Sequence, residues 1–348
     1  MFEHPSDRVD LRSDTITQPT PGMREAMLSA KLGDDVFGED PTVIELQERM
    51  ASIMGKEAGL LVPSGTMSNA IAIRAHTQPG DEIITEEHSH IYVYEAGGFA
   101  ALSGCSVALV AGNRGIMEPE AVARKIRKPG DCMSHYPNGS LVCIENTSNR
   151  GGGTFYPQSS LDEIARVSKE SGCALHVDGA RIFNAAEASG EDPARIVRDC
   201  DTVSICISKG LGAPVGGVLV GSRSLIDEAH RWRKMFGGGM RQAGVLAAAG
   251  LYALDHNRER LSDDHARALV LAKELRAIAG FDVDIESVRT NMVYVSTESP
   301  ASEVAAWLGS VGIDVLGLGS NLLRLVIHLH ITDEDIDKTV HAFKNFSS

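Results

Sequence analysis

A single lysine in a stretch of glycine and apolar residues is the first residue of this sequence that suggests chemistry. Lys209 follows the alternating segment 203–208 and precedes Gly210, Gly212 and Pro214. A lysine held by glycines in a dry cleft can lose its proton, because desolvation disfavours the ammonium ion, and the neutral amine is a nucleophile. The pattern therefore indicates a functional lysine rather than a solvated one.

Two further features end apolar segments of strand-like character. Asp178 closes segment 173–178, where a carboxylate is costly to bury unless it is paired, although it can also cap a helix that starts near Arg181. The segment VPSGTMSN, 62–69, leads from a strand through the turn 64–66 into a helix whose free N–H groups can hold a phosphate. It lacks the spacing of a nucleotide P-loop, and alone it also fits an ordinary strand-to-helix connection.

A phosphate-binding turn, an acid and a lysine at three strand ends are the groups that pyridoxal phosphate requires. The lysine forms a Schiff base with the aldehyde, the acid keeps the pyridine nitrogen protonated, and the turn fixes the phosphate. Open α/β sheets bind ligands at the carboxyl ends of their strands, where these groups are expected. His90 lies near another strand end, where an imidazole can stack on the ring or move a proton, although a lone histidine is more often structural.

Alternating strand and helix signals predict the elements that position these groups. Short apolar segments occupy 59–62, 82–85, 106–110, 141–145, 173–178, 203–208 and 216–221. Thr20 and Asp40, each followed by proline, predict helix starts, and Ser160 with Glu163 predicts a capping box at the start of helix 160–169. This alternation predicts an α/β fold with a mostly parallel sheet flanked by helices.

The pattern changes after about residue 250. A helical run ends at Gly280, and a strand, a helix, a second strand and a final helix opened by Thr332 follow. A chain of 348 residues is long enough for one large domain with a smaller satellite. We therefore predict a large domain, 1–250, and a smaller C-terminal α+β domain, 251–348.

The charge and hydropathy of the sequence limit which kinds of partner the protein can bind. The chain has 33 Lys and Arg against 47 Asp and Glu, a formal charge of -14 that argues against nucleic acid. The first residues lack the apolar core of a secretory signal, and the apolar segment 243–254 is shorter than the roughly 20 residues that span a bilayer. Six cysteines without a C-x-x-C pair fit buried thiols. We expect a cytoplasmic protein that binds a small molecule and neither nucleic acid nor membrane.

Nine segments, in order between residues 10 and 330, resemble the low-specificity L-threonine aldolases. They are DLRSDT (10–15), GDDVFGEDP (33–41), VPSGTMSN (62–69), SHIYVYEAGG (89–98), IENT (144–147), HVDGAR (176–181), SKGLGAPVG (208–216), GGGMRQAG (237–244) and LRLVIH (323–328). The resemblance implies the aspartate-aminotransferase-like fold (fold type I), with pyridoxal phosphate as cofactor. It also implies cleavage of L-threonine or L-allo-threonine to glycine and acetaldehyde, and usually a homotetramer.

The resemblance also implies roles for particular residues. Lys209 would form the Schiff base, Asp178 would pair with the pyridine nitrogen, and His90 would stack on the ring. The further cofactor-binding residues would be Gly65, Thr66, Arg181, Ser208 and Arg241, and the substrate-binding residues Ser13, Arg181 and Arg324. His135 takes the place of a second active-site histidine, and which histidine handles the β-hydroxyl group stays open. A planar guanidinium suits carboxylate recognition, which supports Arg324 independently.

Departures and alternatives remain. The sequence departs from the family pattern at three positions: it has Phe37 where the family often has Tyr, Ser148 where it often has His, and Gly217 where it often has Ser. These differences bear on which substrate is preferred and not on the type of reaction. His328 and His330 have no further ligand at metal-binding spacing, so we expect no metal. An amino-acid β-lyase or aminotransferase would need the same lysine and aspartate, and a cofactor-free interaction module is the alternative from another class. Product analysis and the yellow colour of bound cofactor would separate these functions.

Overall fold

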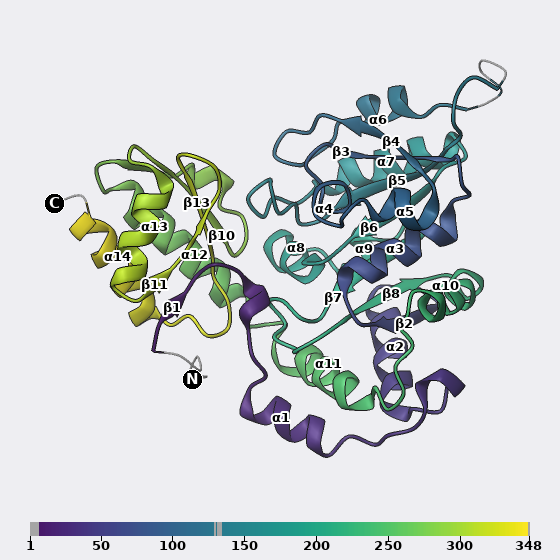
Figure 1. Cartoon of the computed structure of the whole chain (residues 1–348), viewed down its shortest axis with the longest axis horizontal. Coiled ribbons are helices and arrows are strands. Elements are labelled where there is room, and N and C mark those ends of the chain that lie inside the picture. The colour runs from purple at the N-terminus through teal and green to yellow at the C-terminus, as the bar shows by residue number, and fades with distance from the viewer. Residues whose placement is uncertain (1–6, 129, 131–133, 347–348) are drawn as a thin grey trace.

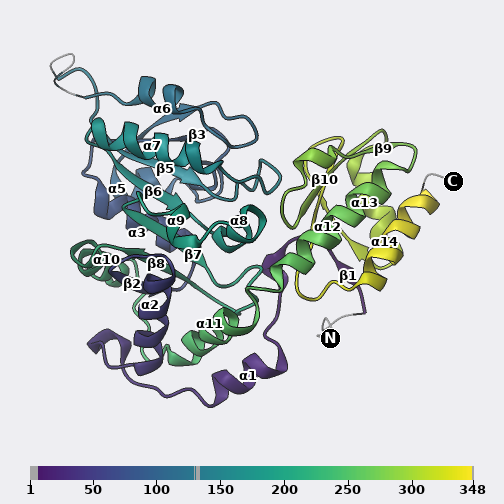
Figure 2. The ribbon, with the colours of Figure 1, turned by 180° about the vertical axis from the view of Figure 1, so that it is seen from behind.

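The computed structural model describes residues 7–128, 130 and 134–346 and has two bodies side by side (Figure 1). The larger body contains the main sheet. The smaller body holds the C-terminal part of the chain, and Val9 and Asp10 near the start of the described residues also lie at it, as the view from behind shows too (Figure 2). In the described part of the chain, no helix has the length and apolar character needed to cross a membrane.

The main sheet has seven strands in the order β2-β8-β7-β6-β5-β3-β4. The strands are β2 (Ala58–Val62), β3 (Glu82–Glu86), β4 (Ser106–Val110), β5 (Gly139–Glu145), β6 (Ala174–Asp178), β7 (Thr202–Cys206) and β8 (Gly217–Gly221). β8 runs antiparallel to both neighbours and the other pairs are parallel, so the predicted mostly parallel sheet is confirmed. β7 ends at Cys206, two residues before the predicted end, which places Ser208 and Lys209 in the loop to β8.

Helices pack on both faces of this sheet. They are α1 (Pro21–Leu28), α2 (Pro41–Ile53), α3 (Gly65–His76), α4 (His90–Val93), α5 (Gly98–Ser103), α6 (Pro119–Lys125), α7 (Gln158–Glu170), α8 (Ile182–Ser189), α9 (Pro193–Ile196), α10 (Arg223–Met235) and α11 (Gly244–His256), with short 3-10 helices η1 (Asp14–Ile16) and η2 (Asp35–Phe37). A large hydrophobic cluster joins the sheet to helices through residues such as Leu46, Val142, Val177, Ile205 and Ala247.

Of the three helix starts that cap residues predict in the larger body, two are confirmed and one is wrong. Thr20 accepts a hydrogen bond from the backbone N–H of Met23, and Asp40 accepts from that of Val43, so both proline-linked caps are confirmed. The predicted capping box at Ser160 is wrong. Helix α7 begins earlier, after Pro157, which already places Ser160 in its first turn, and no side chain caps it.

The smaller body has its own core around an antiparallel sheet in the order β12-β13-β10-β9. Its elements are α12 (Leu261–Arg276), β9 (Phe281–Asp282), η4 (Ile285–Ser287), β10 (Met292–Thr297), α13 (Ala301–Ser310), β12 (Leu316–Gly317), β13 (Leu322–Val326) and α14 (Asp333–Phe346), and β1 (Val9–Asp10) pairs in parallel with β11 (Ile313–Asp314). Thr332 and Asp335 form a reciprocal capping box at α14.

Two segments link the bodies. Val9 and Leu11, from the N-terminal segment, are part of the smaller body's core. Helix α11 spans residue 250 but packs on the main core through Ala249 and Leu254, and α12 contributes Leu271 to the second core. The division of the chain at residue 250 stays a prediction.

Candidate active site

Two adjoining cavities lie at the carboxyl edge of the main sheet, the first at the ends of β5 and β6, where the two bodies meet, and the second at the ends of β6 and β7. We call the first the arginine cavity, because it is lined by Arg150, Arg181 and Arg324, and its volume is about 300 Å³. The second, the glycine cavity, is lined by Gly65 and Gly216 and has about 280 Å³. Both cavities share four residues, which are His90, Asp178, Ala180 and Lys209. Larger cavities of about 560 and 800 Å³ lie elsewhere but contain neither the lysine nor the aspartate.

The glycine cavity includes the start of helix α3. Ser64 caps the helix by accepting a hydrogen bond from the backbone N–H of Met67 at 3.1 Å, and Gly65 and Thr66 follow as the first helical residues. A Cβ atom on Gly65 would lie 2.6 Å from the Sγ atom of Cys206, so this position has no room for a side chain. The N–H groups of a first helical turn have no partner within the helix and attract anions. This end of the cavity suits a phosphate group.

Asp178 ends β6 as a buried carboxylate that faces both cavities. Its Oδ2 atom accepts a hydrogen bond from Asn69 Nδ2 at 2.9 Å, and its Oδ1 atom accepts from the N–H of Ala180 at 3.2 Å. No lysine or arginine among the described residues forms an ion pair with it. Because a buried charge without a counter-charge is costly, this carboxylate suits a cationic N–H group supplied by a ligand, such as a protonated pyridine.

A buried hydrogen-bond network connects Asp178 to His90. Asn69 donates both to Asp178 and to Glu95, the latter at 2.7 Å, and Glu95 Oε1 lies 2.8 Å from His90 Nδ1. Burial by itself would lower the pKa of His90, but the contact with Glu95 and the charge of Asp178 outweigh it and raise that pKa. His90, Glu95 and Asp178 each have one polar atom within 4.8 Å of the others. The Asn69 amide hydrogens point into this gap, which disfavours a cation there.

The network continues away from the cavities. His176, which is fully buried, contacts Asn69 Oδ1 through Nε2 at 3.1 Å and Thr202 Oγ1 through Nδ1 at 2.9 Å. Burial lowers the pKa of His176 to about 3, so this imidazole is neutral. The orientation of Asn69 is therefore set from both sides, and with it the orientation of Asp178.

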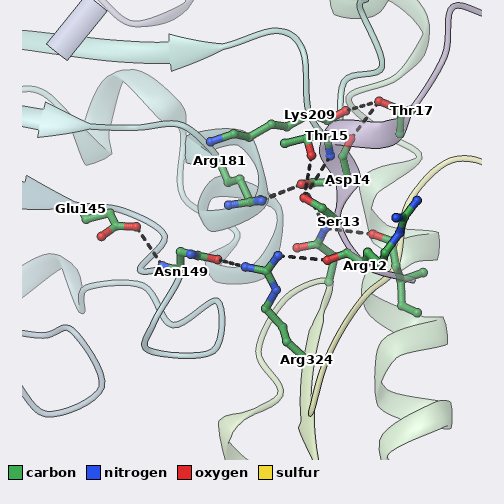
Figure 3. Close-up of polar contacts among 12 residues, drawn as sticks. Arg12, Ser13, Asp14, Thr15, Thr17, Glu145, Asn149, Arg181, Lys209 and Arg324 are labelled. Atoms are coloured by element: carbon green, nitrogen blue, oxygen red, sulfur yellow. Dashed lines mark hydrogen bonds and ion pairs between the residues drawn. The ribbon is translucent and has the colours of Figure 1, made fainter. Parts of the chain in front are cut away.

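Lys209 lies in the loop between β7 and β8 and lines both cavities. The N-terminal segment holds this loop in place, because Thr17 Oγ1 donates to the backbone oxygen of Lys209 at 3.1 Å. Ser208 Oγ donates to the backbone oxygen of Gly216 at 3.2 Å, across the same loop. Arg181 lines the arginine cavity together with Lys209, and Figure 3 shows both side chains.

The arginine cavity contains two guanidinium groups with different partners. Arg181 forms a bidentate ion pair with Asp14, with distances of 2.7 Å from Nε to Oδ2 and 2.6 Å from Nη2 to Oδ1. Arg324 donates from Nη1 to Asn149 Oδ1 at 2.8 Å and from Nη2 to the backbone oxygen of Arg12 at 3.0 Å (Figure 3). Its buried Nε atom has no hydrogen-bond partner in the described part of the chain.

Ser13 lies beside these arginines at the start of η1. Its Oγ accepts from the backbone N–H of Thr15 at 3.3 Å and from the hydroxyl of Thr15 at 2.9 Å, and both residues line the arginine cavity. The guanidinium of Arg324 and the hydroxyl of Ser13 belong to residues that line the same cavity, whereas two donors of Arg181 are occupied by Asp14. These are the groups that a bound carboxylate could contact.

Two predicted site residues lie outside both cavities. His135 is exposed in the loop before β5, and β5 then runs seven residues to Glu145 at the cavity, a length of roughly 20 Å. Arg241 is exposed, pairs with Asp34 at 2.8 Å, and lies over the ring of Phe37. One copy of the chain does not bring these side chains to the cavities, and their predicted roles stay predictions.

His328 and His330 contact the N-terminal segment. His328 Nε2 lies 2.8 Å from the backbone oxygen of Asp10, and His330 Nε2 accepts from the N–H of Gln18 at 2.9 Å. These contacts connect the smaller body to the segment that contains Ser13 and Asp14.

Sequence reasoning assigned no role to several residues that the cavities contain. Glu145 ends β5 next to Asp178, and Tyr94 lies with its ring centroid 5.6 Å from that of His90. Asn69 and Glu95 complete the network behind Asp178. For Glu145 a signal existed, since an acidic residue at the end of an apolar strand is the same pattern that marked Asp178.

Comparisons with known proteins agree with this geometry. The model of the β-eliminating lyase family matches residues 10–298. The chain is 45% identical over 343 residues to probable low-specificity L-threonine aldolase 2 of Arabidopsis thaliana, covering 97% of this chain and 96% of the relative. It is 44% identical to low specificity L-threonine aldolase of Escherichia coli K12, covering 97% of this chain and 99% of that one.

Solved structures agree in fold. Threonine aldolase of Leishmania major aligns with a TM-score of 0.82 at 21% identity, covering 98% of this chain and 100% of that chain. A putative L-allo-threonine aldolase from Listeria monocytogenes aligns with a TM-score of 0.81 at 20% identity, covering 97% and 96%. These likenesses confirm the predicted aspartate-aminotransferase-like fold. With the sequence identities above, they show that the chain belongs to the low-specificity L-threonine aldolase family, within the β-eliminating lyases.

Proposed function

We propose that this protein cleaves β-hydroxy-α-amino acids, with L-threonine or L-allo-threonine as substrate, to glycine and an aldehyde, using pyridoxal phosphate. The observation that supports this most strongly is the meeting of Lys209, the buried carboxylate of Asp178 and the start of α3 around one pair of cavities. The extensive identity to low-specificity L-threonine aldolases supports the choice of reaction among those that the cofactor allows.

The residues present fit the cofactor. Lys209 would bind it covalently through Nζ, Asp178 would pair with the pyridine N–H, and the N-terminal turn of α3 with Gly65 and Thr66 would hold the phosphate. His90 would lie against the ring, with Glu95 fixing the imidazole through Nδ1. When bound, the cofactor supplies an electron sink for the pair released at Cα when the Cα–Cβ bond breaks.

The arginine cavity would hold the amino-acid substrate. Arg324 lines this cavity beside Ser13, with Nη1 bonded to Asn149 and Nη2 to the backbone of Arg12, and we propose that its guanidinium binds the substrate carboxylate together with Ser13. Arg181 lines the same cavity as Lys209, and its charge is balanced by Asp14. The bond between His90 and Glu95 leaves the Nε2 atom of His90 available on the cavity side.

Assembly and location follow as further proposals. We propose a homotetramer, in which the exposed side chains of His135 and Arg241 are accessible to another copy of the chain. We also propose a cytoplasmic location. The five cysteines that the structure describes support it, because all are buried free thiols.

The products of the purified holoenzyme test the proposed reaction. Incubation with L-threonine and with L-allo-threonine should yield glycine and acetaldehyde in equal amounts, without any added acceptor. An oxo acid with ammonia would instead indicate a β-lyase, and an oxo acid formed only with an acceptor would indicate an aminotransferase. A colourless protein that binds no cofactor would contradict the aldolase, β-lyase and aminotransferase functions alike and would support an interaction module.

A further inference from the structure

Glu145 is a second buried carboxyl group at the carboxyl edge of the main sheet. It ends β5 and is the direct neighbour of Asp178 in the register of β5 and β6. It is 6% exposed and lines the arginine cavity together with Lys209 and Arg324. Within the described ranges, no lysine or arginine forms an ion pair with it.

Two backbone donors fix this carboxyl group. Oε2 accepts from the N–H of His90 at 3.0 Å, and Oε1 accepts from the N–H of Asn149 at 2.9 Å. A carboxylate has about four acceptor sites, so each oxygen keeps one lone pair for another partner. Glu145 thus has a fixed position and spare capacity to exchange a proton with a group in the cavity.

The charges around Glu145 set its protonation. The imidazole of His90 comes from α4, the carboxylate of Asp178 from β6, the guanidinium of Arg181 from the start of α8, and the phenol of Tyr156 from the segment before α7. Burial, together with the like charge of Asp178, raises the pKa of Glu145 to about 7. A carboxyl group of this kind changes its protonation near neutral pH, where general acid–base groups work best.

Asn149 relates Glu145 to the proposed substrate site. Its backbone N–H donates to Glu145, and its side-chain Oδ1 accepts from Arg324 Nη1 at 2.8 Å, as Figure 3 shows. A substrate whose carboxylate is bound by Arg324 therefore lies in the same small cavity as Glu145. Asn149 fixes the position of the Glu145 carboxyl group relative to the guanidinium of Arg324.

We infer that Glu145 is a catalytic proton-transfer residue of the aldolase reaction, an inference that rests on the proposed function. Its carboxylate takes the proton of the substrate's β-hydroxyl group. The Cα–Cβ bond then breaks, its electron pair moves toward Cα, and the β-carbon leaves as the aldehyde. Glu145 returns the same proton to Cα, so the products are glycine and aldehyde and the carboxylate is regenerated.

A purely structural role is the competing explanation, because Glu145 also joins the loops that contain His90 and Asn149. Glu86 provides a matched control. It ends the parallel strand β3, is 3% exposed, and accepts backbone N–H groups of His88 and Gly112. Burial raises its pKa as well, but it lines neither of the two cavities. In either glutamine variant, one acceptor oxygen is left for two backbone N–H donors.

The test compares the holoenzymes of the parent, Glu145→Gln and Glu86→Gln. Three quantities are measured: kcat/KM for L-threonine between pH 5.5 and 9, the exchange of the α-protons of glycine in D₂O followed by NMR, and the absorbance of the bound cofactor. Glycine exchange needs no aldehyde, so it reports proton transfer at Cα alone. Glu145→Asp, which keeps a carboxyl group but retracts it, is measured in the same way.

The parent should show kcat/KM rising with pH, because the base works in its ionised form. Pairing of Asp178 with the pyridine N–H offsets part of the like charge that raises the pKa of Glu145, so the rise is centred at or below about 7. Glu145→Gln should lower kcat and glycine exchange by about 10²–10⁴-fold, lose this rise, and keep the cofactor absorbance. Glu145→Asp should keep the rise at a lower rate, and Glu86→Gln should match the parent.

Several outcomes would overturn the inference. They are a parent profile that is flat from pH 5.5 to 9, a Glu145→Gln variant that keeps the rise or exchanges glycine at the parent rate, and equal losses in the two glutamine variants. If Glu145→Gln does not fold, an unchanged rate in Glu145→Asp overturns it. A parent that releases no glycine from L-threonine would instead refute the proposed function itself.

Discussion

Asp14 and Arg181 form a buried ion pair whose loss should destabilise the protein strongly. Asp14 is fully buried and Arg181 is 6% exposed, and both oxygens of the carboxylate are bonded to the guanidinium. In Asp14→Asn the side chain keeps its size but loses its charge and one acceptor, which leaves the guanidinium buried without a counter-charge. Removing one partner of such a pair costs about 3–5 kcal/mol. This is a large part of a typical stability of about 5–15 kcal/mol.

Asp314→Asn is the matched control. Asp314 also forms a bidentate contact with an arginine near the N-terminus, Arg8, at 2.8 and 2.6 Å, but this pair is exposed to solvent. Exposed pairs contribute little, because water screens them. Urea unfolding at pH 7, followed by circular dichroism, should therefore show a clearly lower midpoint for Asp14→Asn and an almost unchanged midpoint for Asp314→Asn.

The pH dependence gives a second check on Asp14. Burial alone would raise the pKa of Asp14, but the charge and hydrogen bonds of Arg181 outweigh it and lower that pKa to about 2 from its ordinary 3.8. A depressed pKa stabilises the fold above the unfolded value, and this contribution is lost as the pH falls through the folded one. The stability difference between parent and Asp14→Asn should be constant from pH 5 to 8 and shrink below about pH 4. Equal midpoints for parent and Asp14→Asn at pH 7 would refute the reasoning.

Further predictions concern the substrate site and the histidines. Arg324→Lys should raise KM for L-threonine at least tenfold and leave the cofactor absorbance normal, because lysine keeps the charge but cannot form the bidentate hydrogen bonds of a guanidinium. An unchanged KM would show that Arg324 does not bind the substrate carboxylate. His90→Phe should alter the cofactor absorbance as well as the rate. His135→Phe should change discrimination between L-threonine and L-allo-threonine without altering that absorbance, if a neighbouring copy supplies this side chain; unchanged discrimination in the assembled enzyme would exclude His135 from the site.

The sequence could predict the groups that end strands. Asp178 and Lys209 each follow a short apolar segment, and the carboxyl ends of parallel strands meet at one edge, so their proximity follows from local patterns. The caps at Thr20 and Asp40 were visible for the same reason, because a cap and its proline are adjacent in the chain. Glu145 had the same local signal as Asp178, but nothing in the sequence indicated which acidic residues face the cavity.

Long-range contacts could not be predicted in this way. The pair between Asp14 and Arg181 joins residues 167 positions apart, and the bond between Asn69 and Asp178 joins residues 109 positions apart. No periodicity encodes such contacts, since they depend on how helix α3 and the N-terminal segment pack over the sheet. The exposed position of His135 is a comparable case, because it follows from the direction of β5 rather than from its neighbours in sequence.

The attachment of the cofactor to Lys209 can be measured directly. The holoenzyme is reduced with borohydride, digested, and mapped by mass spectrometry, with Lys209→Ala treated in parallel. We predict that the parent retains the cofactor on the peptide that contains Lys209, and that Lys209→Ala retains none and releases no glycine from L-threonine. Cofactor fixed to a different lysine, or full turnover by Lys209→Ala, would contradict the proposed active site.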